Sequence, residues 1–170
     1  MSTLLLALNA KYIHSNIAVR YLQKYAAPFL SQPPQILELT INNRMDFILD
    51  EIFRRSPDLL LFSTYIWNVD LVRRLAAEYR KLRPDALIGG GGPEVSYESE
   101  AFLRQNPAFD LIVRGEGEET VRHLLAARES GLDWTILPGL TVRSGQAVRT
   151  NPPRPALDLA SLPFPYEADL

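Results

Sequence analysis

Glycine-rich stretches follow two short apolar runs in the middle of the chain. Ala86–Ile88 leads directly into Gly89–Gly92, and Leu111–Val113 leads through an arginine into Gly115–Gly117. Glycine loses the most backbone freedom on folding, so four in succession indicate a tight turn or a place where another group approaches the backbone closely. The spacing leaves two interpretations open, a ligand-binding edge and a simple strand-to-helix turn.

Other side chains capable of ligand chemistry lie near the ends of apolar runs. His14 belongs to a polar loop, where it either ligates a metal or cofactor or is a capping or exposed histidine. The hydroxyls of Ser63–Tyr65 follow the most apolar run of the chain. Glu116, Glu118 and Glu119 either bind a metal or stabilise the first turn of a helix. Tyr65 and Trp67 form either a core edge or a stacking surface, and the sequence does not separate the two.

Several common functions are excluded by the residues. No Gly-x-Gly-x-x-Gly opens the first helix, no lysine follows the glycine run as in a P-loop, and no Gly-x-Ser-x-Gly elbow occurs. The chain has no cysteine, which excludes disulfides, thiolate metal sites and iron–sulfur ligation, and two histidines cannot form a three-histidine zinc site. A net charge of −2 with scattered arginines predicts no nucleic-acid partner. The longest apolar runs are too short for a membrane span, so we expect no membrane partner. The absence of cysteine favours a cytoplasmic location.

The chain alternates between apolar runs and helical patterns. We expect strands over 3–8, 35–40, 59–62, 86–88 and 111–113, each followed by a helix, with the fourth helix over 96–104. This alternation predicts an α/β fold with a five-stranded parallel sheet and helices on both faces. Five units favour the flavodoxin/Rossmann-like order 2-1-3-4-5, whose ligand crevice lies at the carboxyl ends of the strands. Residues 9–14, 63–65 and 89–92 should meet there.

The final part of the chain has a different character. Residues 139–143 and 147–150 flank Ser144-Gly145-Gln146 and predict a small hairpin, and a proline-rich linker follows. We therefore expect a Rossmann-like domain over residues 1–135, and a hairpin and linker toward a further domain over 136–170.

A series of short blocks resembles one known family. The blocks are Gly90–Ser96, Asp110–Val113, Arg114–Thr120, Leu137–Leu140 and Leu162–Tyr166. Together they resemble the N-terminal cobalamin-binding domain of cobalamin-dependent radical S-adenosylmethionine (SAM) enzymes. This group includes anaerobic magnesium-protoporphyrin monomethyl ester cyclases. The resemblance covers essentially the whole chain.

The resemblance implies a cofactor and a set of site residues. Cobalamin would bind at the carboxyl ends of the strands, with its nucleotide tail buried between the sheet and its helices. The loop after the first strand would face the corrin, and the residues after the third and fourth strands would line the tail pocket. The candidate cofactor-binding residues are Asn9, Ala10, Lys11, Tyr12, His14, Ser63, Thr64, Tyr65, Gly89, Gly90, Gly91, Gly92, Pro93, Glu94, Gly115 and Glu116. No catalytic or metal-ligating residue is expected in this chain.

Two departures shape the functional expectation. Many cobalamin domains carry Asp-x-His-x-x-Gly after the first strand, whereas the loop over 9–16 reads NAKYIHSN, so we expect no protein ligand below the cobalt. The Cys-x-x-x-Cys-x-x-Cys motif that holds a [4Fe-4S] cluster is missing and would be expected beyond Leu170, in a radical SAM domain in cis that also binds SAM. We thus expect the cobalamin-binding part of a larger enzyme of methyl transfer or ring formation, not catalytic alone. The alternatives are a degenerate interaction domain that no longer binds cobalamin and a flavodoxin-like flavin binder.

Overall fold

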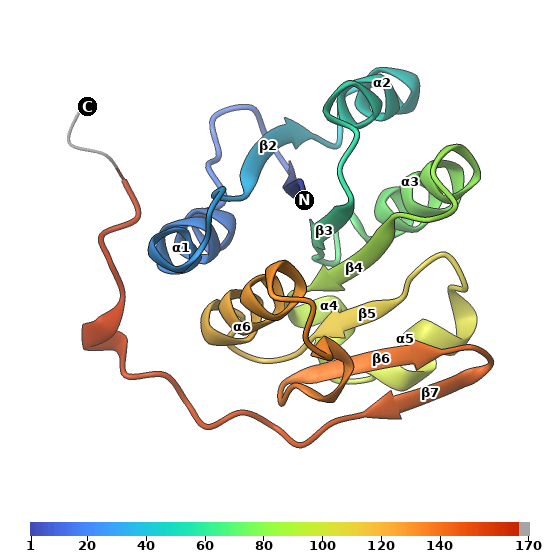
Figure 1. Ribbon diagram of the computed structural model, residues 1–170. Coiled ribbons are helices and arrows are strands. Elements are labelled where there is room, and N and C mark those ends of the chain that lie inside the picture. Colours follow the sequence, from blue (N-terminus) through green and yellow to red (C-terminus); the bar gives the residue numbers. More distant parts are fainter. Residues whose placement is uncertain (167–170) are drawn as a thin grey trace.

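A single mixed sheet forms the central layer of the structure (Figure 1), a computed structural model that describes residues 1–166 of the chain. Within this range the sheet has seven strands in the order β2-β1-β3-β4-β5-β6-β7. The first five are parallel, and β6 and β7 continue the sheet in antiparallel pairing. The strands are β1 (Thr3–Asn9), β2 (Gln35–Thr40), β3 (Leu59–Ser63), β4 (Leu87–Gly91), β5 (Leu111–Val113), β6 (Leu140–Ser144) and β7 (Ala147–Thr150).

The expected order 2-1-3-4-5 is confirmed, but the expected number of strands is wrong. The hairpin over 140–150 does not stand apart from the sheet, because β6 pairs with β5, with Leu140 opposite Val113 and Val142 opposite Leu111. Leu140 and Val142 are buried, and they cover an edge that would otherwise expose unpaired backbone groups of β5. An isolated two-stranded hairpin is marginally stable, so docking on this edge stabilises both partners.

Helices cover both faces of the sheet (Figure 1). Helices α1 (Ile17–Ala26) and α6 (Glu118–Glu129) pack on one face, and α2 (Met45–Arg55), α3 (Val69–Leu82) and α5 (Ser99–Gln105) pack on the other. The helix expected over 96–104 is instead two short helices, α4 (Pro93–Ser96) and α5. Proline at the first position of α4 begins a helix early, and the non-helical backbone at Glu98 (φ −110°, ψ 43°) interrupts it. Short 3-10 turns occupy Ala27–Phe29, Trp134–Ile136 and Leu159–Ser161.

Alternating leucines position the strands between the two helical layers. Leu4, Leu6 and Leu60 face α2 and α3, whereas Leu5 and Leu61 face α1 and α6. All of these side chains are at most 5% exposed. Complete burial of such a side chain contributes about 1.5–3 kcal/mol, so a one-residue slip of a strand would be costly. The carboxyl ends of β1, β3 and β4 are therefore held in fixed register.

The glycine run lies inside a strand, which corrects the expectation that it follows one. Gly89–Gly91 belong to β4 and pair with β3 and β5, and only Gly92 lies beyond the strand. A Cβ at Gly89 would lie 2.7 Å from the side chain of Leu61 and 2.8 Å from that of Leu111, so these leucines close over it. Gly92 has φ 108°, and a Cβ there would lie 2.4 Å from the carbonyl oxygen of Thr64. Packing and turn geometry thus account for Gly89 and Gly92.

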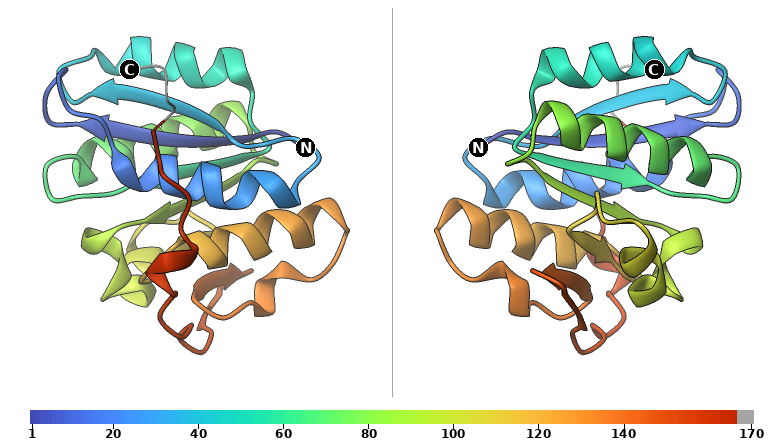
Figure 2. Two further views of the ribbon diagram at one scale, coloured as in Figure 1. Left: turned by 90° about the vertical axis from the view of Figure 1, so that its left-hand side faces the viewer. Right: turned by 90° about the vertical axis from the view of Figure 1, so that its right-hand side faces the viewer.

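The proline-rich segment after β7 lies against the domain. It passes α6 and then runs toward α1 (Figures 1 and 2). The backbone N–H of Leu157 donates to Glu116 Oε2 at 2.7 Å, and the guanidinium of Arg20 stacks on the ring of Tyr166 at 5.8 Å. The part of the expected linker over 167–170 lies outside the described residues. Within 1–166, no helix has the length and apolar character needed to cross a bilayer.

Candidate functional site

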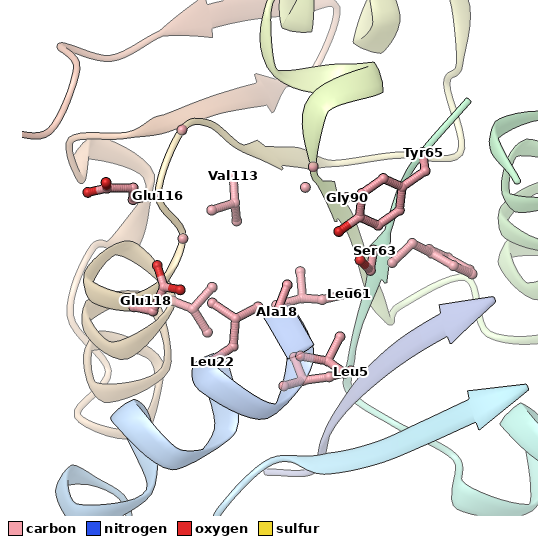
Figure 3. Close-up of a pocket in the computed structure, with 17 residues that line it drawn as sticks. Leu5, Ala18, Leu22, Leu61, Ser63, Tyr65, Gly90, Val113, Glu116 and Glu118 are labelled. Carbon is pink, nitrogen blue, oxygen red and sulfur yellow. The ribbon is translucent and has the colours of Figure 1, made fainter. Parts of the chain in front are cut away.

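A cavity of about 190 Å³ lies between the sheet and the pair of helices α1 and α6, at the carboxyl ends of the central strands (Figure 3). Its walls are apolar side chains from both layers, and backbone of β4 and polar residues complete it. The lining residues are Leu5, Ala18, Val19, Leu22, Leu61, Phe62, Ser63, Tyr65, Gly90, Gly91, Gly92, Val113, Gly115, Glu116, Gly117, Glu118 and Val121.

Small residues at the last positions of the strands create this space. Leu61 and Ser63 alternate along β3 with Phe62, so both point toward α1 and α6, and Gly91 pairs beside Ser63. Toward the middle of the sheet, the leucines Leu5 and Leu61 fill the space beneath α1 and α6. At the ends of β3 and β4 the small residues Ser63 and Gly91 leave it open. Gly117 brings the start of α6 close to α1, because a Cβ there would lie 3.1 Å from Leu22 Cδ2. The result is a slot with an apolar base that is open at the carboxyl edge.

The hydroxyl of Ser63 is oriented by the cap of α1. Asn16 is the N-cap of α1, and its Oδ1 accepts the N–H of Val19 at 3.3 Å. This bond fixes the orientation of the amide, so Asn16 Nδ2 donates to Ser63 Oγ at 3.2 Å. Since the serine oxygen accepts that bond, its O–H is available to donate to a group inside the cavity.

Seven of the sixteen candidate residues meet at this cavity. They come from the ends of β3 and β4 and from the loop before α6, and they are Ser63, Tyr65, Gly90, Gly91, Gly92, Gly115 and Glu116. The turn before α6 therefore lines the same cavity as the glycine run. Glycine at position 115 has φ 67° and open space around it, so the conformation of the turn is what requires it.

The other candidates lie around the cavity rather than in it. Thr64 is fully buried, and its N–H donates to the carbonyl of Gly91 at 2.7 Å. Gly89 is enclosed by leucines, as described above. Pro93 lines a second, more open cavity of about 600 Å³ together with Arg114, Tyr97 and residues 153–156. Glu94 is exposed on α4.

The loop after β1 lies outside the cavity, at the same edge of the sheet. The candidates in it are Asn9, Ala10, Lys11, Tyr12 and His14. The side chain of Asn9 is buried and donates to the carbonyl oxygen of His14 at 2.8 Å. Lys11, Tyr12 and His14 are exposed. The imidazole of His14 thus lines neither cavity.

Two aromatic side chains at the end of β3 stack on each other. The rings of Tyr65 and Trp67 lie 4.4 Å apart between centroids and are inclined by 6°. Trp67 Nε1 donates to the carbonyl of Leu8 at 3.3 Å, and 46% of the residue is exposed. The pair forms a half-exposed aromatic surface beside the mouth of the cavity, since Tyr65 also lines it.

Two of the acidic residues near α6, Glu116 and Glu119, are engaged by protein groups, and Glu118 lines the cavity. Glu116 accepts a backbone bond from Leu157, and Glu119 pairs with Arg122 at 3.3 Å and Arg154 at 3.6 Å. In the described part of the chain, no cluster of three or more His, Cys, Asp or Glu could hold a metal ion. Burial and the nearby Arg122 and Arg154 lower the pKa of His123 below its ordinary value of 6.5, and this histidine lies outside both cavities.

Sequence reasoning missed the contribution of the two helices. Ala18, Val19 and Leu22 of α1 and Val121 of α6 form much of the cavity wall. Their apolar spacing predicts only that they face the core, because a residue that packs on the sheet and one that lines a cavity fall on the same helical face. The available signal was indirect, namely the small residues at the strand ends opposite them.

Comparisons with known proteins agree with this architecture. Residues 3–125 match the family model described as "B12 binding domain". The chain is 32% identical over 146 residues to the cobalamin-dependent radical SAM methyltransferase TokK of Streptomyces tokunonensis, which covers 85% of this chain and 21% of TokK. It is also 32% identical over 112 residues to the anaerobic magnesium-protoporphyrin IX monomethyl ester cyclase of Synechocystis sp., covering 65% and 22% of the two chains. The chain therefore spans about a fifth of the length of these two relatives.

Solved structures show the same fold. The radical SAM methyltransferase TsrM from Kitasatospora setae, with cobalamin and a [4Fe-4S] cluster bound, superposes with a TM-score of 0.68 at 26% identity, over 96% of this chain and 31% of TsrM. The cobalamin-dependent radical enzyme OxsB gives a TM-score of 0.72 at 18% identity, over 91% and 22% of the two chains, and supports the fold alone. These matches confirm the resemblance found in the sequence blocks. The chain belongs to the B12-binding domain family and is homologous to the cobalamin-binding domains of cobalamin-dependent radical SAM enzymes.

Proposed function

We propose that this chain binds cobalamin and holds its nucleotide tail in the cavity between the sheet and helices α1 and α6. The observation that carries the proposal is the cavity itself, an apolar slot at the carboxyl edge in a member of the B12-binding domain family. Ligands of open α/β sheets bind at this edge, at a topological switch point. Here the order β2-β1-β3 places that point beside the cavity.

The residues present fit the tail of cobalamin. Its flat, largely apolar base matches walls formed by Leu5, Leu22 and Leu61 (Figure 3). The missing side chain at Gly91 opens the space that a larger residue would fill, and the Ser63 hydroxyl can donate to a nitrogen or oxygen of the tail. A site of this kind, mostly apolar with a few placed polar groups, is typical of cofactor pockets.

The corrin ring would then lie over the same edge of the sheet. We assign the loop over 9–14, the turn at Pro93 and Glu94, and the aromatic surface of Tyr65 to its surroundings, as supporting contacts outside the tail cavity. When bound, cobalamin supplies a cobalt centre for methyl transfer or for one-electron chemistry. The role of this chain is to hold the cofactor and exclude water from its tail.

We further propose that the chain works as part of a larger radical SAM enzyme. Support comes from the relatives, of which it spans about a fifth, and from TsrM, whose structure includes a [4Fe-4S] cluster. The sequence has no cysteine to ligate such a cluster, so SAM and the cluster would belong to a radical SAM domain in cis. Methyl transfer and ring formation are both represented among the relatives.

Retention of cobalamin by the purified chain tests the first proposal. The protein is mixed with hydroxocobalamin, under oxidising and under reducing conditions, and desalted. We expect the protein fraction to keep the visible absorption of cobalamin. When flavin mononucleotide is offered instead, we expect the protein fraction to keep no flavin absorption. A colourless protein under both conditions would contradict the proposal and favour an interaction domain, whereas retention of the flavin alone would favour a flavin binder.

The variant His14→Ala is expected to leave the visible spectrum of bound cobalamin unchanged. The His14 side chain is exposed and lines neither cavity, so we assign it no bond to cobalt. The matched control is His123→Ala, which replaces the only other histidine, on α6. A band shift in His14→Ala without one in the control would show that His14 ligates cobalt.

A further inference from the structure

Four hydrogen-bond donors converge on the carboxylate of Glu38, in the edge strand β2. Its Oε2 accepts from the backbone N–H of Asn16 at 2.7 Å and from Asn9 Nδ2 at 3.0 Å. Its Oε1 accepts from Arg20 Nη2 at 2.7 Å and from Ser15 Oγ at 3.5 Å. All four donors belong to the end of β1, the following loop and the start of α1.

These bonds tie both ends of the loop Ala10–Ser15 to β2, through Asn9 on one side and Ser15 and Asn16 on the other. Tyr12 and Ile13, its largest apolar side chains, are 70% and 87% exposed, so packing contributes little to holding it. Inside the loop, the His14 N–H donates to the carbonyl of Lys11 at 3.2 Å. The side chain of Glu38 is only 17% exposed, which strengthens charge-assisted bonds relative to those on an open surface.

The same network reaches the tail cavity. Asn16 donates its backbone N–H to Glu38 and its side-chain amide to Ser63 Oγ. Asn9 donates one amide nitrogen to both Glu38 and the carbonyl of His14. The carboxylate therefore connects the loop on one side with the cavity hydroxyl on the other.

Only a carboxylate satisfies this arrangement. Each oxygen of Glu38 accepts two bonds, and all four partners are donors. An amide offers one acceptor oxygen and places an NH₂ group against the remaining donors. Glutamine at this position would therefore set its NH₂ group either against the Arg20 guanidinium or against both the Asn16 N–H and Asn9 Nδ2, since only the Ser15 hydroxyl among the four partners can also accept.

We propose that Glu38 is a positioning residue, which holds the loop Ala10–Ser15 at the carboxyl edge and, through Asn16, orients the Ser63 hydroxyl into the cavity. The consequence for cobalamin rests on the proposed function, whereas the effect on the loop does not. Glu38 itself lines neither cavity and acts through its partners.

Limited trypsin digestion of the chain without cofactor tests the effect on the loop. In Glu38→Gln, we expect cleavage after Lys11, which is exposed in the loop, to be about tenfold faster or more, because bonds to a charged group are lost. The matched control is Glu51→Gln on α2. The side chain of Glu51 is 18% exposed, which is close to the value for Glu38, and it also pairs with arginines, Arg54 and Arg55. None of these partners belongs to the loop Ala10–Ser15.

Cleavage within the helices separates opening of the loop from general unfolding. Sites after Arg54 in α2 and Lys81 in α3 should be cut at the wild-type rate in Glu38→Gln. If this variant does not fold, Asn9→Ala removes the loop's side of the network while keeping the carboxylate, and it should accelerate cleavage after Lys11 in the same way. Wild-type cleavage after Lys11 in the folded variant would overturn the proposal.

Cobalamin titration supplies the second readout. We expect the Kd of Glu38→Gln for hydroxocobalamin to rise about tenfold, as for the loss of one well-placed bond, and that of Glu51→Gln to be unchanged. An unchanged Kd for Glu38→Gln would overturn the part of the proposal that concerns Ser63. If the wild-type chain does not bind cobalamin, the proposed function fails, and the digestion still decides whether Glu38 holds the loop.

Discussion

The variant Ala18→Trp is expected to lose cobalamin while keeping the fold. Ala18 lies on the face of α1 that lines the cavity, beside Leu22 of the same helix and opposite Leu61 of β3 (Figure 3). An indole there would occupy the space that we assign to the nucleotide tail. Because the side chain is partly exposed at an existing opening, it displaces no buried neighbour. We expect the affinity for hydroxocobalamin, measured by titration, to fall at least about 100-fold, equivalent to about 2.7 kcal/mol.

The control for this variant is Ala147→Trp. Ala147 is an exposed residue of β7 at the far edge of the sheet, so the same substitution should leave binding unchanged. Far-ultraviolet circular dichroism and a thermal unfolding curve establish that both variants are folded. Wild-type affinity in a folded Ala18→Trp would place the tail outside this cavity.

The second large effect is expected for Gly92→Ala, which should destabilise the fold by about 2–4 kcal/mol. Gly92 has φ 108° and ψ 171°, a region that is essentially restricted to glycine. A Cβ there would also lie 2.4 Å from the carbonyl oxygen of Thr64. Thr64 cannot move away easily, because it is fully buried and its N–H is bonded to Gly91. The measurement is the free energy of unfolding in urea.

Gly145→Ala is the matched control for backbone strain. Gly145 also has a positive φ, 59°, but nothing lies within 4 Å of a Cβ placed there. The cost should be about 1–2 kcal/mol, that of a left-handed conformation alone. Equal losses in the two variants would mean that the contact with Thr64 does not determine the requirement for glycine at position 92.

The central architecture could be predicted because each unit carries a strong local signal. Leu4–Leu8 and Leu59–Phe62 are continuous apolar runs, as in strands buried on both faces, and amphipathic helices follow them. The sequence indicates the hairpin over 140–150 but not the strand with which it pairs. Pairing between Leu140 and Val113 is a long-range contact, and nothing in the local sequence distinguishes a free hairpin from one that closes an edge.

The glycine run shows the limit of composition as evidence. Four successive glycines indicate that another group lies close to the backbone. At two of them that group belongs to the protein itself: Leu61 and Leu111 at Gly89, and Thr64 at Gly92. Gly90 and Gly91 line the cavity, and no leucine side chain closes over either of them. A sequence does not contain the distances that separate these roles.

Part of the candidate set lines the cavity at the carboxyl edge of the sheet, and the rest of the lining comes from residues that the sequence does not single out. Ser63 could be found because it directly follows an apolar run, and Gly91 because it belongs to the glycine run after another. The bond from the α1 N-cap Asn16 to Ser63 depends on the packing of α1 against β3, which the sequence does not contain. Glu38 alternates with Leu37 and Leu39 in an edge strand, where a charged residue is expected to face solvent, so its four partners could not be foreseen.

Comparison of cobalamin with cobinamide, which lacks the nucleotide tail, tests the central claim most directly. Both corrinoids are titrated into the purified chain and their Kd values are determined from the visible absorption. Because we place the tail in the cavity beside Ser63 and Leu61, cobalamin should bind about 100-fold more tightly than cobinamide. Equal affinities for the two corrinoids would contradict the assignment of the cavity to the tail.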